Sequence, residues 1–152
     1  FENIDEMINV CIQNKNFING ITFGRVDFVN SQNISRENIE TKEVSENVIS
    51  VSKKCKKNNL DFVVGGAVYL DAIENLRKFR EVHLNRFETR KVVFDGAALS
   101  MKNFDEAIKQ AHYFELLWLF NKREYYNELF LEDNLRIQML EKRLEFKLDS
   151  IN

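Results

Sequence analysis

Long hydrophobic runs, proline and any excess of basic residues are all missing from this sequence. Its apolar stretches are far shorter than the roughly 20 residues that a membrane-spanning helix needs. The first residues also lack the basic segment followed by an apolar one that marks a signal peptide. We therefore expect no membrane association and predict a cytoplasmic protein, while the absence of proline by itself carries no functional information.

Basic charge and clustered cysteines are scarce as well. The formal net charge is -2, which gives no electrostatic reason to expect binding to nucleic acid. The two cysteines, Cys11 and Cys55, lie in helix-like segments far apart in the sequence and form no CxxC motif. We expect both to be buried reduced thiols rather than a disulfide.

What is present is the composition of a globular domain, with 44% hydrophobic and 30% charged residues. Apolar spacing predicts that helices and strands alternate along the chain. The predicted helices are residues 2–14, 41–59 with Thr41 as the N-cap, 69–79, and 104–148, the last being one helix or two joined near 131–134. The predicted strands are residues 20–29, 60–68 and 86–94.

This alternation predicts an α/β fold built from βαβ units with a parallel sheet. Three strands are too few for a complete (β/α)8 (TIM) barrel, so residues 1–103 would form about three βα units, the C-terminal part of such a barrel. Residues 104–152 would form a long helical segment that packs on the barrel or on a partner subunit. In such barrels the active site lies at the carboxyl ends of the strands, here residues 24–31, 65–68 and 95–96.

The first of these strand ends is the most informative part of the sequence. Residues 21–31 run from an apolar strand into Gly24 and then place Arg25 and Asp27 on one face of the predicted strand. Asp27 is either a site carboxylate or a simple turn residue. Arg25 either pairs with Asp27 or binds an anion. Gly65 and Gly66 at the next strand end provide either room for close packing or a phosphate site.

Two segments resemble a known family. Residues 1–7 (FENIDEM), followed by residues 20–28 (GITFGRVDF), resemble the helix-to-strand segment of the HpcH/HpaI aldolase and citrate lyase beta-subunit family. The resemblance implies a metal-dependent carbon–carbon lyase with a TIM barrel, in which Asp27 matches the aspartate that holds Mg²⁺ (or Mn²⁺). The matching glutamate would lie upstream of Phe1, so we expect a C-terminal fragment that is inactive alone. Arg25 and Phe28 depart from the family pattern.

The chemistry implied by this resemblance assigns further roles. A metal held by Asp27 would bind a 2-oxo acid (pyruvate-like) or acyl-CoA substrate and stabilise an enolate. A guanidinium would stabilise the same charge, with Arg25 the first candidate and Arg90 the second. Backbone N–H groups around Gly24, together with Arg25, could hold a substrate carboxylate. Arg90 is also placed to form an ion pair with Glu88.

A non-catalytic function is the alternative. Apolar residues on the predicted last helix form one stripe near its start and a narrower, nearly heptad stripe at Ile137, Leu140, Leu144 and Leu148. A narrow stripe on a long helix favours contact with another helix, and three strands leave an open sheet edge. We therefore expect a homo-oligomer, and in this alternative the chain is a barrel-derived domain whose last helix mediates assembly.

Overall fold

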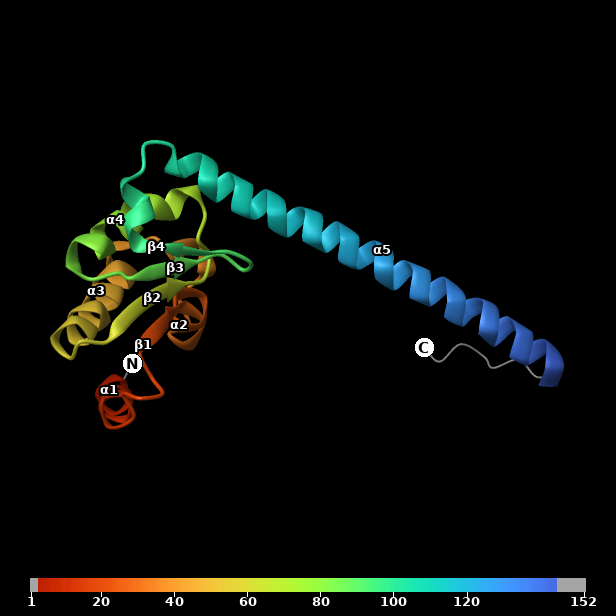
Figure 1. Cartoon of the computed structure of the whole chain (residues 1–152), viewed down its shortest axis with the longest axis horizontal. Coiled ribbons are helices and arrows are strands. Elements are labelled where there is room, and N and C mark those ends of the chain that lie inside the picture. Colours follow the sequence, from red (N-terminus) through yellow and green to blue (C-terminus); the bar gives the residue numbers. More distant parts are fainter. Residues whose placement is uncertain (1–2, 145–152) are drawn as a thin grey trace. The chain divides into compact units, whose positions relative to one another are not determined.

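The structure, a computed structural model, describes residues 3–144. It is a mixed α/β structure with a four-stranded sheet and a long C-terminal helix, and it divides into two compact units, Phe1–His112 and Tyr113–Asn152 (Figure 1). The helices are α1 (Ile4–Gln13), α2 (Arg25–Ser31), α3 (Lys42–Lys57), α4 (Ile73–Val82) and α5 (Phe104–Leu144), with short 3-10 turns at Arg36–Asn38, Leu70–Ala72 and Gly96–Ser100. None of the described helices is long and apolar enough to cross a membrane.

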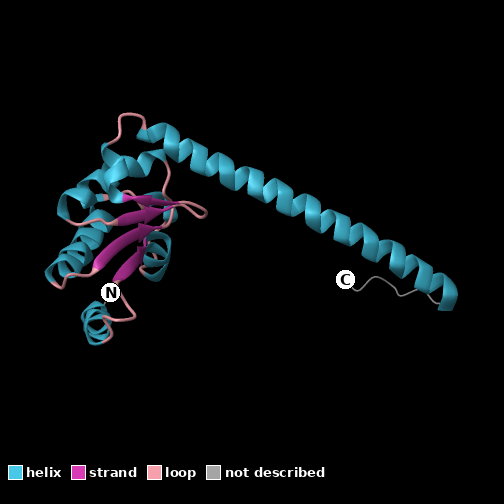
Figure 2. Ribbon diagram, in the orientation of Figure 1, coloured by secondary structure: helices cyan, strands magenta, loops and turns pink. Residues whose placement is uncertain are grey.

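The sheet has the strand order β1-β2-β3-β4 (Figure 2). The strands are β1 (Gly20–Gly24), β2 (Asp61–Gly65), β3 (Arg86–Glu88) and β4 (Val93–Asp95). β1, β2 and β3 are parallel, and the connections between them contain α2 and α3 and then α4. β4 pairs antiparallel with β3. The parallel part of the sheet is therefore made of two βαβ connections, as the sequence predicts.

The two faces of the sheet differ in what covers them. Ile21, Phe23, Phe62, Val64 and Phe87 point to one face and belong to the main hydrophobic core, to which α1, α3, α4 and the start of α5 also contribute. The other residues of the strands point the opposite way because side chains alternate along a strand. We call this side the open face; its residues include Thr22, Val63, Arg86, Glu88 and Val93, and none of these belongs to a hydrophobic cluster of the described residues.

All three predicted strands differ in part from the observed ones, and the strand predicted at 60–68 is the shorter β2, which ends at Gly65. The strand predicted at 20–29 ends at Gly24, and the helix α2 follows at once. The valines in this segment favour a strand, but in the helix Val29 is fully buried against Ile39 and Val44 in a second small core, and this tertiary packing outweighs the local preference. Arg25 and Asp27 therefore lie in the first turn of a helix and are not alternate residues of a strand.

The strand predicted at 86–94 is a hairpin of β3 and β4. Thr89 breaks the strand, because its backbone N–H donates to the carbonyl of Val92 at 2.9 Å and its hydroxyl oxygen accepts from the Val92 N–H at 3.1 Å. These bonds close a tight turn. The sheet consequently has four strands instead of three, and the last one is antiparallel, so the expectation of a wholly parallel sheet is wrong at this edge.

The long helix is continuous. α5 has 41 residues with no interruption near 131–134, so the single-helix alternative is confirmed within the described residues. Its first turns belong to the first unit, where Phe104, Ile108 and Ala111 are buried. Leu148, the last residue of the predicted narrow stripe, lies outside the described residues.

Candidate functional site at the carboxyl edge of the sheet

The carboxyl ends of the three parallel strands form one row. The register pairs Gly24 of β1 with Gly65 of β2, and Gly65 with Glu88 of β3. Neighbouring strands are about 4.8 Å apart, and residues in register on parallel strands point to the same face. The row Gly24, Gly65 and Glu88 therefore lies on the open face of the sheet, at the edge where the strands end.

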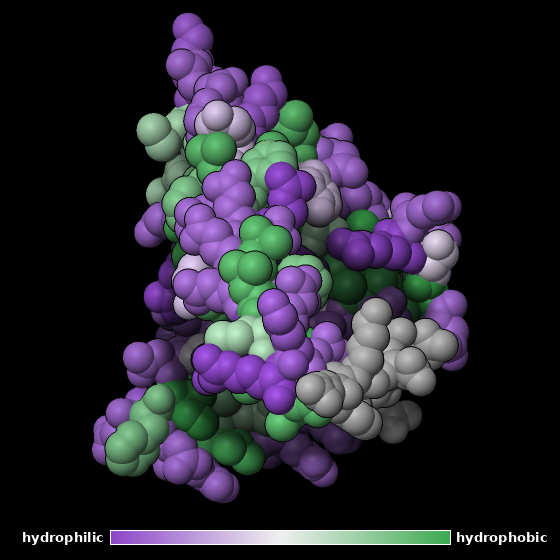
Figure 3. Space-filling model, turned by 90° about the vertical axis from the view of Figure 1, so that its right-hand side faces the viewer, coloured by the Kyte–Doolittle hydropathy of each residue, from purple (hydrophilic) through white to green (hydrophobic). Residues whose placement is uncertain are grey.

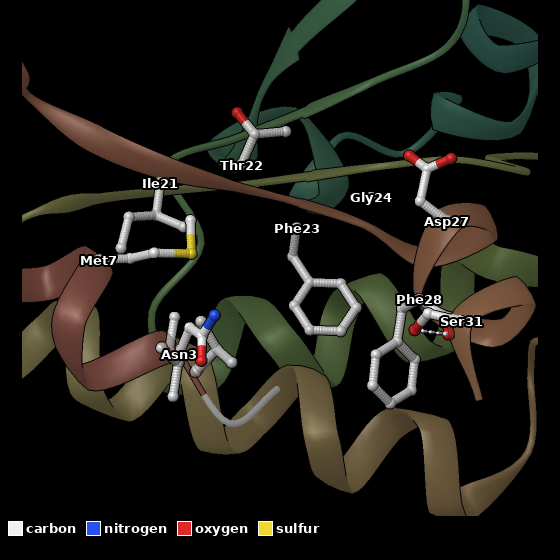
Figure 4. Close-up of a pocket in the computed structure, with 11 residues that line it drawn as sticks. Asn3, Met7, Ile21, Thr22, Phe23, Gly24, Asp27, Phe28 and Ser31 are labelled. Atoms are coloured by element: carbon white, nitrogen blue, oxygen red, sulfur yellow. Dashed lines mark hydrogen bonds between the residues drawn. The ribbon is translucent and has the colours of Figure 1, made fainter.

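Two carboxylates lie over the two glycines of this row. A Cβ atom placed on Gly24 would be 2.7 Å from Oδ2 of Asp27, and one placed on Gly65 would be 2.9 Å from Oε1 of Glu88. The glycines thus leave the space that these oxygens occupy. Figure 4 shows Asp27 on the side of β1 where Thr22 lies, away from Phe23 and Phe28. Asp27 and Glu88 accordingly lie over adjacent strands on one face.

This donor set fits a hard divalent cation that keeps most of its water. Mg²⁺ is usually bound by one or two carboxylates together with water and substrate oxygens, while the protein seldom supplies a full cage. Within residues 3–144 there is no group of three or more His, Cys, Asp or Glu that could hold a metal ion. Asp27, the metal ligand predicted from the sequence, lies on the same face as Glu88, and these two carboxylates would supply the protein ligands of such a cation.

Sequence reasoning missed Glu88 as a partner of Asp27. It placed Glu88 in an ion pair with Arg90, but none of the ion pairs among the described residues joins these two. Only the register of β1, β2 and β3 brings Glu88 near Asp27, and the sequence offers no local signal for that register.

The structure gives Arg25 neither of the two predicted roles, an ion pair with Asp27 or the binding of an anion. Its side chain is 1% exposed, and its Nη1 donates to Oε1 of Glu40 at 2.7 Å. Its Nη2 donates to the carbonyls of Gly66 and Ala67, both at 2.9 Å, and its Nε donates to Gly66 at 3.2 Å. The guanidinium ties the start of α2 to the loop after β2. This burial favours a structural role over contact with a substrate.

The partner of Arg25 is itself held in place. Oε2 of Glu40 accepts a hydrogen bond of 2.8 Å from Nδ2 of Asn75, which is buried at the start of α4. Arg25, Glu40 and Asn75 therefore connect α2, the loop before α3 and α4. Because Asp27 is in the same helical turn as Arg25, this network also fixes the position of the candidate metal ligand.

Gly66 shows why a glycine follows β2. It has a φ of +85°, and a Cβ atom here would be 2.8 Å from the backbone nitrogen of Val26. The close approach of the loop to the start of α2 lets the Gly66 carbonyl accept from Arg25. Close packing, one of the two alternatives for this glycine, therefore accounts for it.

Arg90, the second arginine proposed to stabilise the enolate, is exposed in the turn between β3 and β4, two residues after Glu88. No hydrogen bond or ion pair of its side chain is found among the described residues. The two histidines each contact a backbone carbonyl: Nε2 of His83 is 2.9 Å from that of Leu60, and Nε2 of His112 is 2.9 Å from that of Val68.

An apolar pocket lies on the core side of the same strand end. Its volume is about 330 Å³. Phe23 and Phe28, whose ring centroids are 5.2 Å apart, form part of its wall (Figure 4). The other lining residues include Asn3, Ile4, Met7, Ile21 and Val51. Asp27 and Ser31 border the pocket, so a bound molecule could place a polar group at the carboxyl edge and an apolar group inside.

The cysteines are free and buried, as predicted. Burial in the core, with a smaller contribution from nearby Cys11, raises the pKa of the Cys55 thiol from 9.0 to about 11. The thiol therefore stays protonated near neutral pH and is a poor nucleophile.

No family model, no curated protein and no solved structure matches this chain. The resemblance of residues 1–7 and 20–28 to the aldolase and citrate lyase family accordingly remains a prediction.

Proposed function

We propose that the carboxyl edge binds a divalent cation through Asp27 and Glu88, and that the chain is part of a metal-dependent carbon–carbon lyase. The observation that carries the proposal is the pair of carboxylates placed over Gly24 and Gly65 on the open face. Mg²⁺ or Mn²⁺ is the cation that this donor set fits. The substrate would be a 2-oxo acid or an acyl-CoA.

The arrangement of layers supports a barrel-derived origin. In a (β/α)8 barrel, helices cover the outside of the strands, and the inner face is enclosed by the other strands. Here the main core and its helices lie on one face of the sheet, and Thr22, Arg86 and Val93 of the open face are exposed. One departure is that β4 occupies the edge of β3 at which a closed barrel would continue with a parallel strand.

The proposed chemistry gives each residue a limited task. When bound, the cation would supply Lewis acidity that stabilises negative charge on the oxygen of a cleaved 2-oxo acid or thioester. Asp27 and Glu88 would hold it, and Arg25 would position Asp27 from its buried network. Arg90 is exposed in the turn two residues after Glu88 and remains the candidate for contacting a substrate anion. Backbone N–H groups next to Gly24 would bind a substrate carboxylate.

The test is cation binding measured by titration calorimetry and Mn²⁺ spin resonance. Asp27→Asn and Glu88→Gln keep the size of each side chain and remove its charge, so each should weaken Mn²⁺ binding at least tenfold. Glu37→Gln, which removes an exposed carboxylate on another part of the unit, is the matched control and should change nothing. Equal binding in all three variants would overturn the proposed cation site.

The lyase part of the proposal needs a second measurement. Pyruvate and oxaloacetate should each tighten Mn²⁺ binding to the unmodified chain and fail to do so in Asp27→Asn. Cation binding that is indifferent to both acids would leave the cation site standing and overturn the lyase assignment. Arg90→Gln should weaken the effect of the acids and leave the binding of Mn²⁺ alone unchanged.

A second candidate function, assembly through α5, is favoured by a different observation. The part of α5 in the second unit exposes large hydrophobic side chains along its length, and Figure 3 shows hydrophobic side chains at the surface among hydrophilic ones. They include Phe114, Leu117, Tyr125, Phe130, Leu135 and Leu144. An isolated helix does not keep such a surface in water without a partner. Sedimentation over a range of concentrations should show a dimer or a larger assembly.

A further inference from the structure

The part of α5 in the second unit contains a heptad repeat. Counted in sevens, the a positions are Leu116, Arg123, Phe130, Ile137 and Leu144, and the d positions are Leu119, Tyr126, Asp133 and Leu140. The positions span residues 116–144, long enough to indicate a coiled coil. All the apolar and aromatic members are at least 39% exposed. Only Arg123 and Asp133 interrupt the repeat, and they carry opposite charges.

These two charges select one way of pairing two copies. In an antiparallel pair of helices, an a residue of one helix packs beside a d residue of the other. The register that places Arg123 opposite Asp133 of a second copy also places Leu116 opposite Leu140. The same register therefore pairs each charged interruption with an opposite charge and leaves the outermost layer, Leu116 with Leu140, apolar.

The inner layers agree with this register. Leu119 falls opposite Ile137, and Tyr126 falls opposite Phe130, so each of the four kinds of layer has compatible partners. The two-fold axis of the proposed dimer passes near residue 128, so each layer occurs once on either side of it. A continuous interface of this kind covers residues 116–140, about 36 Å of helix at 1.5 Å per residue.

Other registers do not satisfy the charges. Moving one copy by a heptad places Arg123 opposite Leu140 in one direction or opposite Tyr126 in the other. A parallel pair places Arg123 against Arg123 and Asp133 against Asp133. Each of these arrangements brings an unpaired or repelled charge into the seam, which costs stability.

We propose that α5 dimerises with a second copy of the same chain as an antiparallel coiled coil in which Arg123 of each copy pairs with Asp133 of the other. The inference rests on the assembly function proposed above and gives it a partner, an orientation and a register. The charged layers specify the register, and the apolar layers supply the binding free energy.

The flanking residues contain one unfavourable pair. In this register Lys122 lies near Arg136 of the second copy, because both occupy g positions that flank the seam. Within one copy, Lys122 also lies over the rings of Trp118 and Tyr126, at 5.2 and 5.5 Å. Because Lys122 and Arg136 of the second copy carry the same charge, reversing the charge of Lys122 should remove a repulsion between the copies.

The first experiment is a charge exchange followed by sedimentation. Arg123→Asp places two acidic side chains in each charged layer, and Asp133→Arg places two basic ones. Each variant should dimerise roughly a hundredfold more weakly than the unmodified chain. A mixture of the two single variants should form a heterodimer, and the double variant Arg123→Asp/Asp133→Arg should recover the homodimer.

Orientation is measured separately by pulsed spin resonance. Lys142 lies on the side of the helix away from the seam, so a label on Lys142→Cys leaves the interface intact. The antiparallel register separates the two labelled positions by 28 residues of helix, about 42 Å. A parallel pair would hold them about 20 Å apart, because the helix axes are about 10 Å apart and both labels point outward. Cys11 and Cys55 are buried, and the unmodified chain carried through labelling is the control.

The results distinguish the antiparallel register from assembly through α5 in general. A chain that stays monomeric at high concentration, with unchanged helix content, overturns assembly and register together. A dimer with a short label distance, unaffected by either single charge reversal, overturns the antiparallel register and leaves assembly standing. Lys122→Glu should tighten the dimer several-fold; a weaker dimer in that variant would also contradict the register.

Discussion

The two units use hydrophobic residues in opposite ways. In the first unit the large apolar side chains of β1, β2, α3 and α4 fill a core, and even a charged side chain, Arg25, is buried with partners for its donors. In the second unit none of the described residues is buried, although its composition is just as apolar. The first unit buries its large apolar side chains in a core, whereas the described helix of the second unit leaves its large apolar side chains exposed.

Truncating one phenylalanine in each unit should produce opposite effects in the two units. Phe62 is fully buried in the core, and Phe62→Ala should lower the free energy of unfolding of the first unit by about 4 kcal/mol through lost packing and a cavity. Phe130 is 64% exposed, and Phe130→Ala should leave that unfolding free energy unchanged and weaken self-association. Hydrogen exchange of the first-unit amides, with sedimentation beside it, measures both. Equal losses in the two variants would contradict the division into a complete and an incomplete unit.

Two arginines give a second contrast. Arg25→Ala should cost about 3 kcal/mol of first-unit stability, since it removes the guanidinium that donates to Oε1 of Glu40 and to the Gly66 and Ala67 carbonyls. Arg123→Ala should leave first-unit stability unchanged, because that side chain lies on the exposed helix. Urea unfolding followed by circular dichroism gives the values.

The controls for Arg25 concern the donors and the site. Arg25→Lys keeps the charge but cannot reproduce the forked set of hydrogen bonds, so it should recover only part of the loss. If Arg25→Ala proved as stable as the unmodified chain, the buried network would not be holding α2. Loss of Mn²⁺ binding in Arg25→Lys, at a temperature where the variant is folded, would identify the network as what positions Asp27.

A smaller effect is expected at the loop that receives Arg25. Gly66→Ala should destabilise the first unit by about 2 kcal/mol, because φ is positive there and the new Cβ would press against the backbone of Val26. Ala67 also has a positive φ, so Ala67→Gly is the matched control and should be neutral or slightly stabilising. Thermal unfolding of the two variants compares them directly. A neutral Gly66→Ala would show that α2 can move away from this loop.

The sequence was sufficient wherever the determining contacts are local. The period of Val44, Val48, Val51 and Cys55 predicts α3, whose N-cap is Thr41 as expected. The absence of glycine and proline after residue 104 predicts the long α5. In both cases the pattern lies within one element, so no knowledge of tertiary contacts was needed.

The candidate site was only partly predictable for the opposite reason. Asp27 follows an apolar strand and Gly24, and that short pattern is visible in the sequence. The helix α2 depends on Val29 packing against residues of other segments, and the role of Arg25 depends on Gly66, 41 residues away. Glu88 enters the site only through the register of three strands. None of these contacts leaves a periodic signal, so local reasoning extended the strand and left Glu88 paired with Arg90.

Thiol reactivity compares the packing of the two units directly. At pH 8, the exposed thiol of Lys142→Cys in the second unit should react with a thiol reagent at once. Cys55 should react only as the first unit unfolds, because it is fully buried and its pKa is raised to about 11. Rapid labelling of Cys55 in the folded chain would show that the core of the first unit is open to solvent and that the two units do not differ in packing as the structure indicates.

The same thiol predicts how stability depends on pH. The folded pKa of Cys55 lies above its ordinary value of 9.0, so the folded state favours the neutral thiol. Its contribution to stability is complete below pH 9.0 and is lost as the pH rises toward about 11, because the unfolded chain then releases this proton more readily. Between those pH values the unmodified chain should lose more unfolding free energy than Cys55→Ala, whose core has no thiol to ionise. Parallel losses in the two proteins would mean that other groups set the alkaline limit and that Cys55 titrates as it would in water.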